Sequence, residues 1–403
     1  MYAMLKVVLV ELNKLINGVK SMSNKDEILK IQGYDEFKCT AEKCRFTCCA
    51  GWDIGIDDDT YERWNCEKGN KEYILKNIES RKCGKKQAYF VNKETNEACP
   101  FLDNMGLCQI IKNHGEENLA LTCRSFPRIE NTVGGKKELS LSCSCPEVVE
   151  IISNIQGKLT MNSDSSVENN IDLLEYEIRS GLENITKEED LALDKKLIVS
   201  YQMLMELLKY KSFGRGALIN TIERYKDRAK VEEVIADCDE LEEDIDGAIE
   251  EINYLFIDII ENYKEVEGLK EILSDISDFA EEAELEELAE NWNQFKSDFK
   301  NFDELLERCV VSKILSNCIS SDLNEMIIAF ELIVLEYLLV RYAMFIKFSM
   351  SENKDLNLQD VKDYIVAFSR IIGNNTEAVV EFIKDGFGDT ILEIGYLCFI
   401  TLF

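Results

Sequence analysis

The chain contains only three prolines, Pro100, Pro127 and Pro146, and the 257 residues from 147 to 403 contain none. Proline breaks helices, because its ring clashes with the preceding turn and it lacks the amide hydrogen that a helix needs. A proline-free stretch of this length therefore predicts a mainly α region. Apolar residues at steps of three and four support this and predict helices over 193–208, 242–256, 280–295, 302–318, 323–350, 358–372 and 376–383, the first preceded by a capping box at 186–189.

Charge divides the chain at about the same place. Residues 1–150 hold 22 Lys and Arg against 23 Asp and Glu, whereas residues 151–403 hold 24 against 54 and carry almost all of the net charge of −31. Nucleic acid is not an expected partner, because binding it begins with neutralising phosphates. The predicted organisation is a small, irregular, Cys-rich metal-binding module followed by a larger acidic helical bundle. Its segments are an N-terminal extension (1–22), the Cys-cluster module (23–152), a linker (153–170) and the acidic α-helical domain (171–403).

Histidine is almost absent, since His114 is the only one. Ser-His-Asp and Cys-His catalysis, HExxH zinc sites and C2H2 fingers all need imidazole, so a single histidine argues against these classes. Cysteine, by contrast, occurs fifteen times, and eleven of these residues lie before residue 150. The sequence therefore directs the search for chemistry to sulfur.

The expected compartment decides how these cysteines are interpreted. The apolar run at 7–10 is too short for a signal peptide, and the long apolar stretch at 327–350 contains Glu331, Glu336 and Arg341, which are costly within a bilayer. We therefore expect a buried core helix there, no membrane span, and a cytoplasmic protein. Structural disulfides are disfavoured in the cytoplasm, where clustered cysteines more often hold a metal.

Nine of the eleven cysteines of the first 150 residues form two groups, and Cys66 and Cys83 are interpreted as incidental thiols. The first is Cys39-x4-Cys44-x3-Cys48-Cys49, and the second comprises Cys99, Cys108, Cys123, Cys143 and Cys145. Thiolates bind soft or borderline metals, and close spacing lets one loop supply several ligands. Paired C-x2-C knuckles, which structural zinc favours, are absent, and the wider spacing favours an iron–sulfur cluster with zinc as the second choice. The radical S-adenosylmethionine pattern is excluded, because Gly51 stands where its third cysteine would be.

These motifs resemble the YkgJ-like cysteine-cluster family, and in particular its flagellin lysine-N-methylase branch. The resemblance rests on CTAEKCRFTCCAGW at 39–52, CPFLD at 99–103, GLC at 106–108, TC at 122–123, FPR at 126–128 and SCSCPE at 142–147. It covers about residues 34–150, and the helical remainder contributes no motif. Because the family's last cysteine precedes Pro-Glu, the resemblance favours Cys145 over Cys143. The resulting candidate metal ligands are Cys39, Cys44, Cys48, Cys49, Cys99, Cys108, Cys123 and Cys145.

The resemblance implies methyl transfer from S-adenosylmethionine to surface lysines of flagellin by a protein that carries a 4Fe–4S cluster. No glycine-rich loop follows an expected strand, so the common dinucleotide-type cofactor site is not recognisable in the sequence. Two other functions remain open. One is a noncatalytic, metal-stapled module whose acidic helices bind a basic partner, and the other is a redox or metal-delivery protein.

Overall fold

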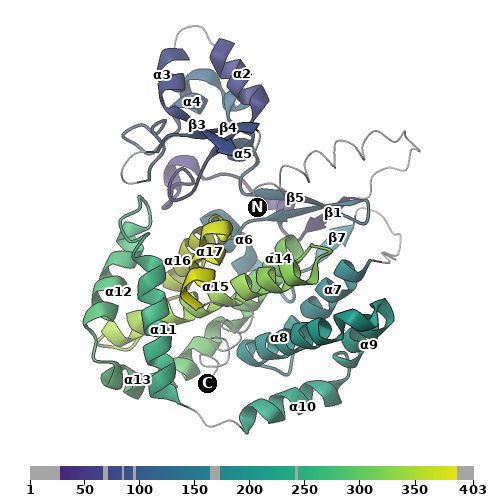
Figure 1. The fold of residues 1–403 in the computed structure, drawn as a ribbon. Helices are drawn as coiled ribbons and strands as arrows, with labels where there is room; N and C mark the ends of the chain where they lie inside the picture. The colour runs from purple at the N-terminus through teal and green to yellow at the C-terminus, as the bar shows by residue number, and fades with distance from the viewer. Residues whose placement is uncertain are drawn as a thin grey trace. The chain divides into compact units, whose positions relative to one another are not determined.

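The structure, a computed structural model, describes residues 28–387 apart from 67–70, 84–85, 94–96, 164–172 and 241–243 (Figure 1). The predicted N-terminal extension, residues 1–22, lies outside the described residues. Helices dominate the part of the chain that is described, so the prediction of a mainly α protein is confirmed.

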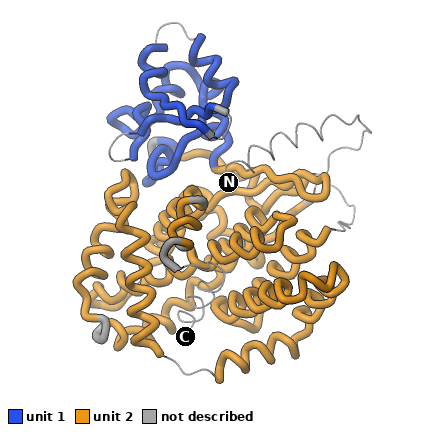
Figure 2. The backbone as a smooth tube through the Cα atoms, viewed as in Figure 1, with its two compact units in different colours: residues 1–27, 41–126 blue, residues 28–40, 127–403 orange. Residues whose placement is uncertain are grey.

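The chain forms two compact units (Figure 2). Unit 1 contains residues 41–126, and unit 2 contains residues 28–40 together with 127–403. The division differs from the predicted one, because 28–40 and 127–152 belong with the helices and not with most of the cysteines. The reason is a sheet in unit 2 that is built from both of these segments.

Unit 1 is a small α+β unit around a three-stranded antiparallel sheet of order β2-β4-β3. Its core includes Trp64 and Phe101, whose rings meet edge to face with centroids 5.9 Å apart. Asp57 accepts hydrogen bonds from the amides of Thr60 and Leu121, so one carboxylate satisfies the first turns of two helices. The elements are η2 (Ala41–Lys43), β2 (Gly55–Ile56), α2 (Asp58–Cys66), α3 (Lys71–Lys76), β3 (Ile78–Cys83), β4 (Lys86–Val91), α4 (Gln109–His114), η3 (Glu116–Asn118) and α5 (Leu121–Ser125).

Unit 2 begins with a four-stranded sheet of order β5-β6-β1-β7, in which β1 is parallel to β6 and antiparallel to β7. Gly134 and Gly135 join β5 to β6 with φ of 59° and 80°, the positive values that a two-residue hairpin turn requires. Pro146 occupies the first turn of the helix that follows, where its missing amide hydrogen costs nothing. The elements are β1 (Ile28–Ile31), η1 (Tyr34–Glu36), β5 (Arg128–Val133), β6 (Lys136–Leu141), α6 (Pro146–Asn154) and β7 (Met161–Ser163).

The remainder of unit 2 is helical. Its central element is α15, which is buried on almost every face and contacts α12, α13, α14 and α16. The expected buried core helix at 323–350 is therefore confirmed with both ends correct. The helices are α7 (Leu174–Thr186), α8 (Leu193–Tyr210), η4 (Lys211–Phe213), α9 (Arg215–Arg224), α10 (Arg228–Asp239), α11 (Ile245–Ile260), α12 (Lys270–Glu282), α13 (Leu285–Phe299), η5 (Lys300–Phe302), α14 (Asp303–Asn317), α15 (Leu323–Met350), α16 (Leu358–Phe368), the π-helix η6 (Ser369–Gly373) and α17 (Thr376–Phe387).

Two local expectations are wrong. Thr186 does not cap the start of a helix: it is the last residue of α7, and its hydroxyl donates to the carbonyl of Leu182 at 2.8 Å. The capping-box pattern fails because α8 begins only at Leu193. The strands were also not anticipated, and β7 lies within the segment expected to be a linker. Among the described helices, none is long and apolar enough to cross a membrane.

Candidate functional site

The eight candidate metal ligands are divided between the two units. Cys39 and Cys145 belong to unit 2, and Cys44, Cys48, Cys49, Cys99, Cys108 and Cys123 belong to unit 1. None of the cysteines whose side chains are described is joined in a disulfide.

Five of the unit 1 cysteines lie on segments that local structure brings together. We call Cys48, Cys49, Cys99, Cys108 and Cys123 the thiol group. An antiparallel bridge joins Ala50 to Ala98, and the amide of Cys99 donates to the carbonyl of Cys49 at 2.9 Å. Cys108 precedes α4, and Cys123 lies within α5.

The electrostatics of these thiols shows that they are neighbours. The pKa of Cys99 is lowered, chiefly by a hydrogen bond that the Cys49 thiol donates. A hydrogen bond with Cys48 lowers the pKa of Cys49, but the bond with Cys99 and burial outweigh it and raise the pKa. Burial, together with the charges of Cys48 and Cys108, raises the pKa of Cys123 to about 12. The ionisation of Cys49, Cys99 and Cys123 is therefore influenced by the neighbouring sulfurs of the thiol group.

A cation lies beside this group. Lys93 donates from Nζ to the carbonyl oxygen of Cys49 at 2.5 Å. Burial lowers the pKa of Lys93, and the charges of Cys99, Cys49 and Cys123 partly oppose this shift. A positive charge near a thiol stabilises the thiolate, which is the form that binds metals.

The donor chemistry of the thiol group suits a soft metal, because all five donors are sulfur. Within the described residues, however, no three His, Cys, Asp or Glu side chains are arranged so that they could hold a metal ion. Cys44 lies outside the thiol group and donates from Sγ to the carbonyl of Phe46 at 2.7 Å. Cys39 is exposed, and Cys145 is a buried residue at the start of α6. The eight-residue ligand set remains a prediction.

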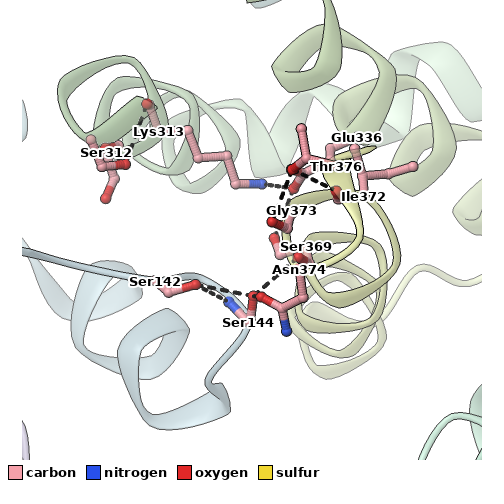
Figure 3. Close-up of polar contacts among 11 residues, drawn as sticks. Ser142, Ser144, Ser312, Lys313, Glu336, Ser369, Ile372, Gly373, Asn374 and Thr376 are labelled. Carbon is pink, nitrogen blue, oxygen red and sulfur yellow. Dashed lines mark hydrogen bonds and ion pairs between the residues drawn. The ribbon is translucent and has the colours of Figure 1, made fainter. Parts of the chain in front are cut away.

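A second candidate is a buried polar network in unit 2 (Figure 3). We define it as Ser144, Lys313, Glu336, Ser369 and Asn374. Lys313 on α14 forms an ion pair with Glu336 on α15, and Ser369 donates to the same carboxylate at 2.8 Å. The Ser144 hydroxyl lies 3.0 Å from the Ser369 carbonyl and 3.1 Å from Oδ1 of Asn374. The network therefore joins the loop after β6 to three helical segments.

The π-helix η6 helps to form this network. A π-helix replaces the usual i→i+4 bonding with a wider turn, and such turns are frequent at functional sites. Here the carbonyl of Ser369 in η6 accepts the Ser144 hydroxyl, and the Arg370 guanidinium donates to the carbonyl of Ser144 at 2.9 Å. The SCSCPE motif is thus fixed to the helical core by its serine and not only by its cysteines.

Cys143 in the same motif is hydrogen-bonded to Cys309 on α14. A hydrogen bond from the Cys309 thiol lowers the pKa of Cys143, and the charge of Lys313 acts in the same direction. The same bond raises the pKa of Cys309. The carboxylate of Glu336 and the two thiols overcome desolvation and raise the pKa of Lys313. Lys313 is therefore a buried, charged ammonium group.

Sequence patterns did not identify this network. The one available signal was Glu336, an acidic residue within an otherwise apolar helix, and it was interpreted only as evidence against a membrane span. Such a residue needs a buried partner, but its partner Lys313 lies 23 positions away on another helix. Only the packing of α14 against α15 reveals the pair.

Comparison with known proteins supports one family. The model of the FliB lysine N-methylase C-terminal domain matches residues 151–400. The Lysine-N-methylase of Salmonella typhimurium is 29% identical over 135 residues, which is 33% of this chain and 34% of that protein. The Flagellar biosynthetic protein FliU of Salmonella muenchen is 29% identical over 147 residues, 36% of this chain and 87% of that protein. The chain thus spans about a third of the length of the matched lysine-N-methylase, and no solved structure matches it.

Proposed function

The chain belongs to the family of the FliB lysine N-methylase C-terminal domain, and from this premise we propose that it is a protein-lysine N-methyltransferase. The observation that carries the proposal is the extent of the family match, which begins within α6 and continues through α7–α17. The relatives named lysine-N-methylase support the same activity.

We propose flagellin as the substrate protein. This rests on the cysteine motifs of residues 39–147 and on the flagellar name of one relative. The acidic residues of 151–403 suit a lysine-bearing partner, because opposite charge accelerates encounter and favours correct partners. We also propose a cytoplasmic location, as the sequence predicts.

We propose S-adenosylmethionine as the methyl donor. When bound, it supplies an electrophilic methyl group: the lysine nitrogen forms a bond to this carbon, the carbon–sulfur bond breaks, and the amine loses one proton. The task of the protein is to hold a neutral amine in line with the methyl group and to accept the proton. No residue is assigned to that proton.

We further propose that the thiol group holds an iron–sulfur cluster, with zinc as the alternative. The support is its donor chemistry: interacting thiols from four segments of unit 1, with the charge of Lys93 favouring the ionised form of Cys99 and Cys123. Cys48, Cys99, Cys108 and Cys123 come from four different segments, and we propose them as the four ligands. Cys49 would then act as a neighbour that hydrogen-bonds to a ligand sulfur.

The test is methyl transfer with protein purified without oxygen. Purified flagellin is incubated with methyl-labelled S-adenosylmethionine, and the modified lysines are located by mass spectrometry. Flagellin whose lysines have been acetylated is the control and should take up no label. If cluster-replete protein binds flagellin but transfers no methyl group, the noncatalytic binding module becomes the better description. If iron and sulfide are absent and zinc is present, the iron–sulfur proposal fails.

A further inference from the structure

The end of α8 carries an exposed aromatic corner, which we define as residues 209–215 (Lys-Tyr-Lys-Ser-Phe-Gly-Arg). Phe213 is 74% exposed, more than any other large apolar side chain described in unit 2. Its ring meets that of Tyr210 edge to face, with centroids 6.0 Å apart. Residues 211–216 are all exposed, so no described part of the chain covers the aromatic corner.

The aromatic corner is also basic, although it lies in an acidic region. Residues 207–222 contain no Asp or Glu, and this is the longest such stretch of 151–403. Lys209, Lys211 and Arg215 give the corner its positive charge. A partner for the corner should therefore combine an apolar recess with negative charge, and most of the surface charge of this same chain is negative.

A recess of this kind exists in unit 2. It is a pocket of about 300 Å³ between α7, α9 and α10. Its floor includes Ile185 and Ile222, which are 6% and 1% exposed, and Val231 lines it from α10. An apolar cavity of roughly 150 Å³ can hold a benzene ring, so this pocket has room for one phenyl side chain.

The rim of the pocket has an excess of acid, opposite in sign to the aromatic corner. It carries the carboxylates of Glu188, Asp190 and Glu232 against the cations Lys226 and Arg228. Asp190 and Glu232 already pair with Arg228, and all three side chains are more than 60% exposed. Charge therefore contributes modestly at this rim, and the apolar floor must supply most of the binding free energy.

We propose that Phe213 of one copy of the chain inserts into this pocket of a second copy. The phenyl ring meets the apolar floor, while Lys211 and Arg215 on either side of it meet the acidic rim. Phe213 does not line the pocket of its own chain: it precedes α9, and Ile222 lies two turns into that helix, about 11 Å further along its axis. The contact joins two different surfaces, so it builds a ring or a chain of copies.

Sedimentation velocity of the full chain over a concentration series tests the proposal. A reducing agent prevents cross-linking through exposed cysteines. A small contact is weak, so the wild-type sedimentation coefficient should rise with concentration and fall again on dilution, whereas Phe213→Ser should stay monomeric. The matched control is Tyr254→Ser, which removes a 59% exposed aromatic ring from α11 and should associate as the wild type does. A monomeric wild-type protein, or a Phe213→Ser variant that associates normally, would overturn the proposal.

Variants of the pocket give the sharper test. Val231→Trp and Asn184→Trp fill it from α10 and α7, and each alone should be monomeric. A mixture of Phe213→Ser with Val231→Trp offers one intact pocket and one intact corner per pair, so it should form a 1:1 dimer and nothing larger. If the mixture stays monomeric although both variants show the wild-type circular dichroism spectrum and melting temperature, the corner and the pocket do not meet. If both tryptophan variants associate as the wild type does, the pocket is not the acceptor.

Another occupant of the aromatic corner would give a different result. An anionic lipid surface is indicated if the wild-type protein is monomeric but co-sediments with vesicles of equal parts phosphatidylglycerol and phosphatidylcholine, and Phe213→Ser does not. That outcome overturns self-association. None of these measurements follows methyl transfer, so the proposed function stands or fails independently of them.

Discussion

The two units place their polar chemistry in opposite settings. Unit 1 has a small core that includes Trp64 and Phe101. Beside this core lie interacting thiols, most of which are partly exposed to solvent. In unit 2 an extensive helical core encloses charged pairs whose side chains are at most 12% exposed. A small core stabilises a fold only weakly and often needs a metal or cross-link, whereas a large core can bear the cost of buried charge.

The buried charges of unit 2 converge on one helix. The Arg179 guanidinium forms two 2.6 Å hydrogen bonds with Glu138 and also donates to the carbonyl of Leu315 on α14. Lys196 pairs with Glu307, and Lys313 pairs with Glu336, so α14 contributes a residue to each of these pairs as well. Such pairs fix which helix packs where, because a wrong register leaves a charge buried alone.

The largest effect is expected in unit 1. Cys99→Ser removes a sulfur at the centre of the thiol group, and because the binding free energy of a structural metal is folding free energy, unit 1 should lose both its metal and its resistance to protease. Unit 2 should keep its helical signal. Metal and sulfide analysis with limited proteolysis of residues 41–126 measures this.

The matched control for that variant is Cys238→Ala on α10, a half-buried cysteine of unit 2. It should leave metal content unchanged. If Cys238→Ala empties the site, or if Cys99→Ser retains full metal, the assignment of metal binding to the thiol group is wrong.

The next effect belongs to unit 2. Arg179→Met leaves Glu138 buried without its cation, and both side chains are less than 5% exposed. We expect the free energy of unfolding to fall by about 3–5 kcal/mol, as measured by chemical denaturation. The double variant Arg179→Met/Glu138→Leu should recover most of this loss. If the double variant is as unstable as the single one, lost packing and not an unpaired charge explains the effect.

The contrast between the units also explains what the sequence could predict. Helices with a clear apolar face were predictable, and 323–350 matches α15 at both ends because its apolar run is long and bounded. Among the helices of 171–403, α7, α9, α10 and α12 were not predicted; α9 is short, and half of the residues of α10 are charged, whereas α7 and α12 do have an apolar face. The family match covers 151–400, the region in which no motif was found. A family model sums weak residue preferences at many positions of a helical core, and a short motif cannot detect these.

For the candidate sites the limit was distance along the chain. The sequence identified the cysteines of the thiol group by their type and local spacing. It could not show that Cys39 and Cys145 join unit 2, because that follows from the parallel pairing of β1 with β6. The Lys313–Glu336 ion pair likewise depends on how α14 packs against α15, and the pocket that Arg228 helps to line depends on how α7, α9 and α10 pack. Composition predicts which kinds of side chain are present, whereas tertiary contacts decide which of them lie together.

A smaller effect on the free energy of unfolding is expected at Asp303, a partly buried carboxyl group. Burial and the nearby charge of Asp194 raise the pKa of Asp303 to about 6 from its usual 3.8, although Arg341, Lys196 and Lys300 oppose the shift. The folded state therefore binds this proton more tightly than the unfolded state, and the contribution of Asp303 to stability falls as pH rises from about 4 to about 6. Asp303→Asn should raise stability by about 1 kcal/mol at pH 7 after allowance for solvent screening.

That gain should vanish at pH 4, where the wild-type carboxyl is itself protonated. Denaturation curves at both pH values measure the difference. The control is Glu304→Gln, because Glu304 is adjacent in sequence and 86% exposed; its effect should stay within about 0.5 kcal/mol at both pH values. A gain for Asp303→Asn that is the same at pH 4 and pH 7 would mean that the carboxyl is not the cause.

The smallest effect should come from the ion pairs of α10. Arg228 contacts two carboxylates, whereas Arg179 makes both of its charged contacts with the single carboxylate of Glu138, but Arg228 is 68% exposed. Water replaces most of what the pairs provide, so Arg228→Met should leave the free energy of unfolding close to that of the wild-type protein. Chemical denaturation beside Arg179→Met tests this directly. If Arg228→Met lowered the free energy of unfolding as much as Arg179→Met does, burial would not explain the strength of these ion pairs. Arg228 would then stabilise the packing of α10 against the α7–α8 connection.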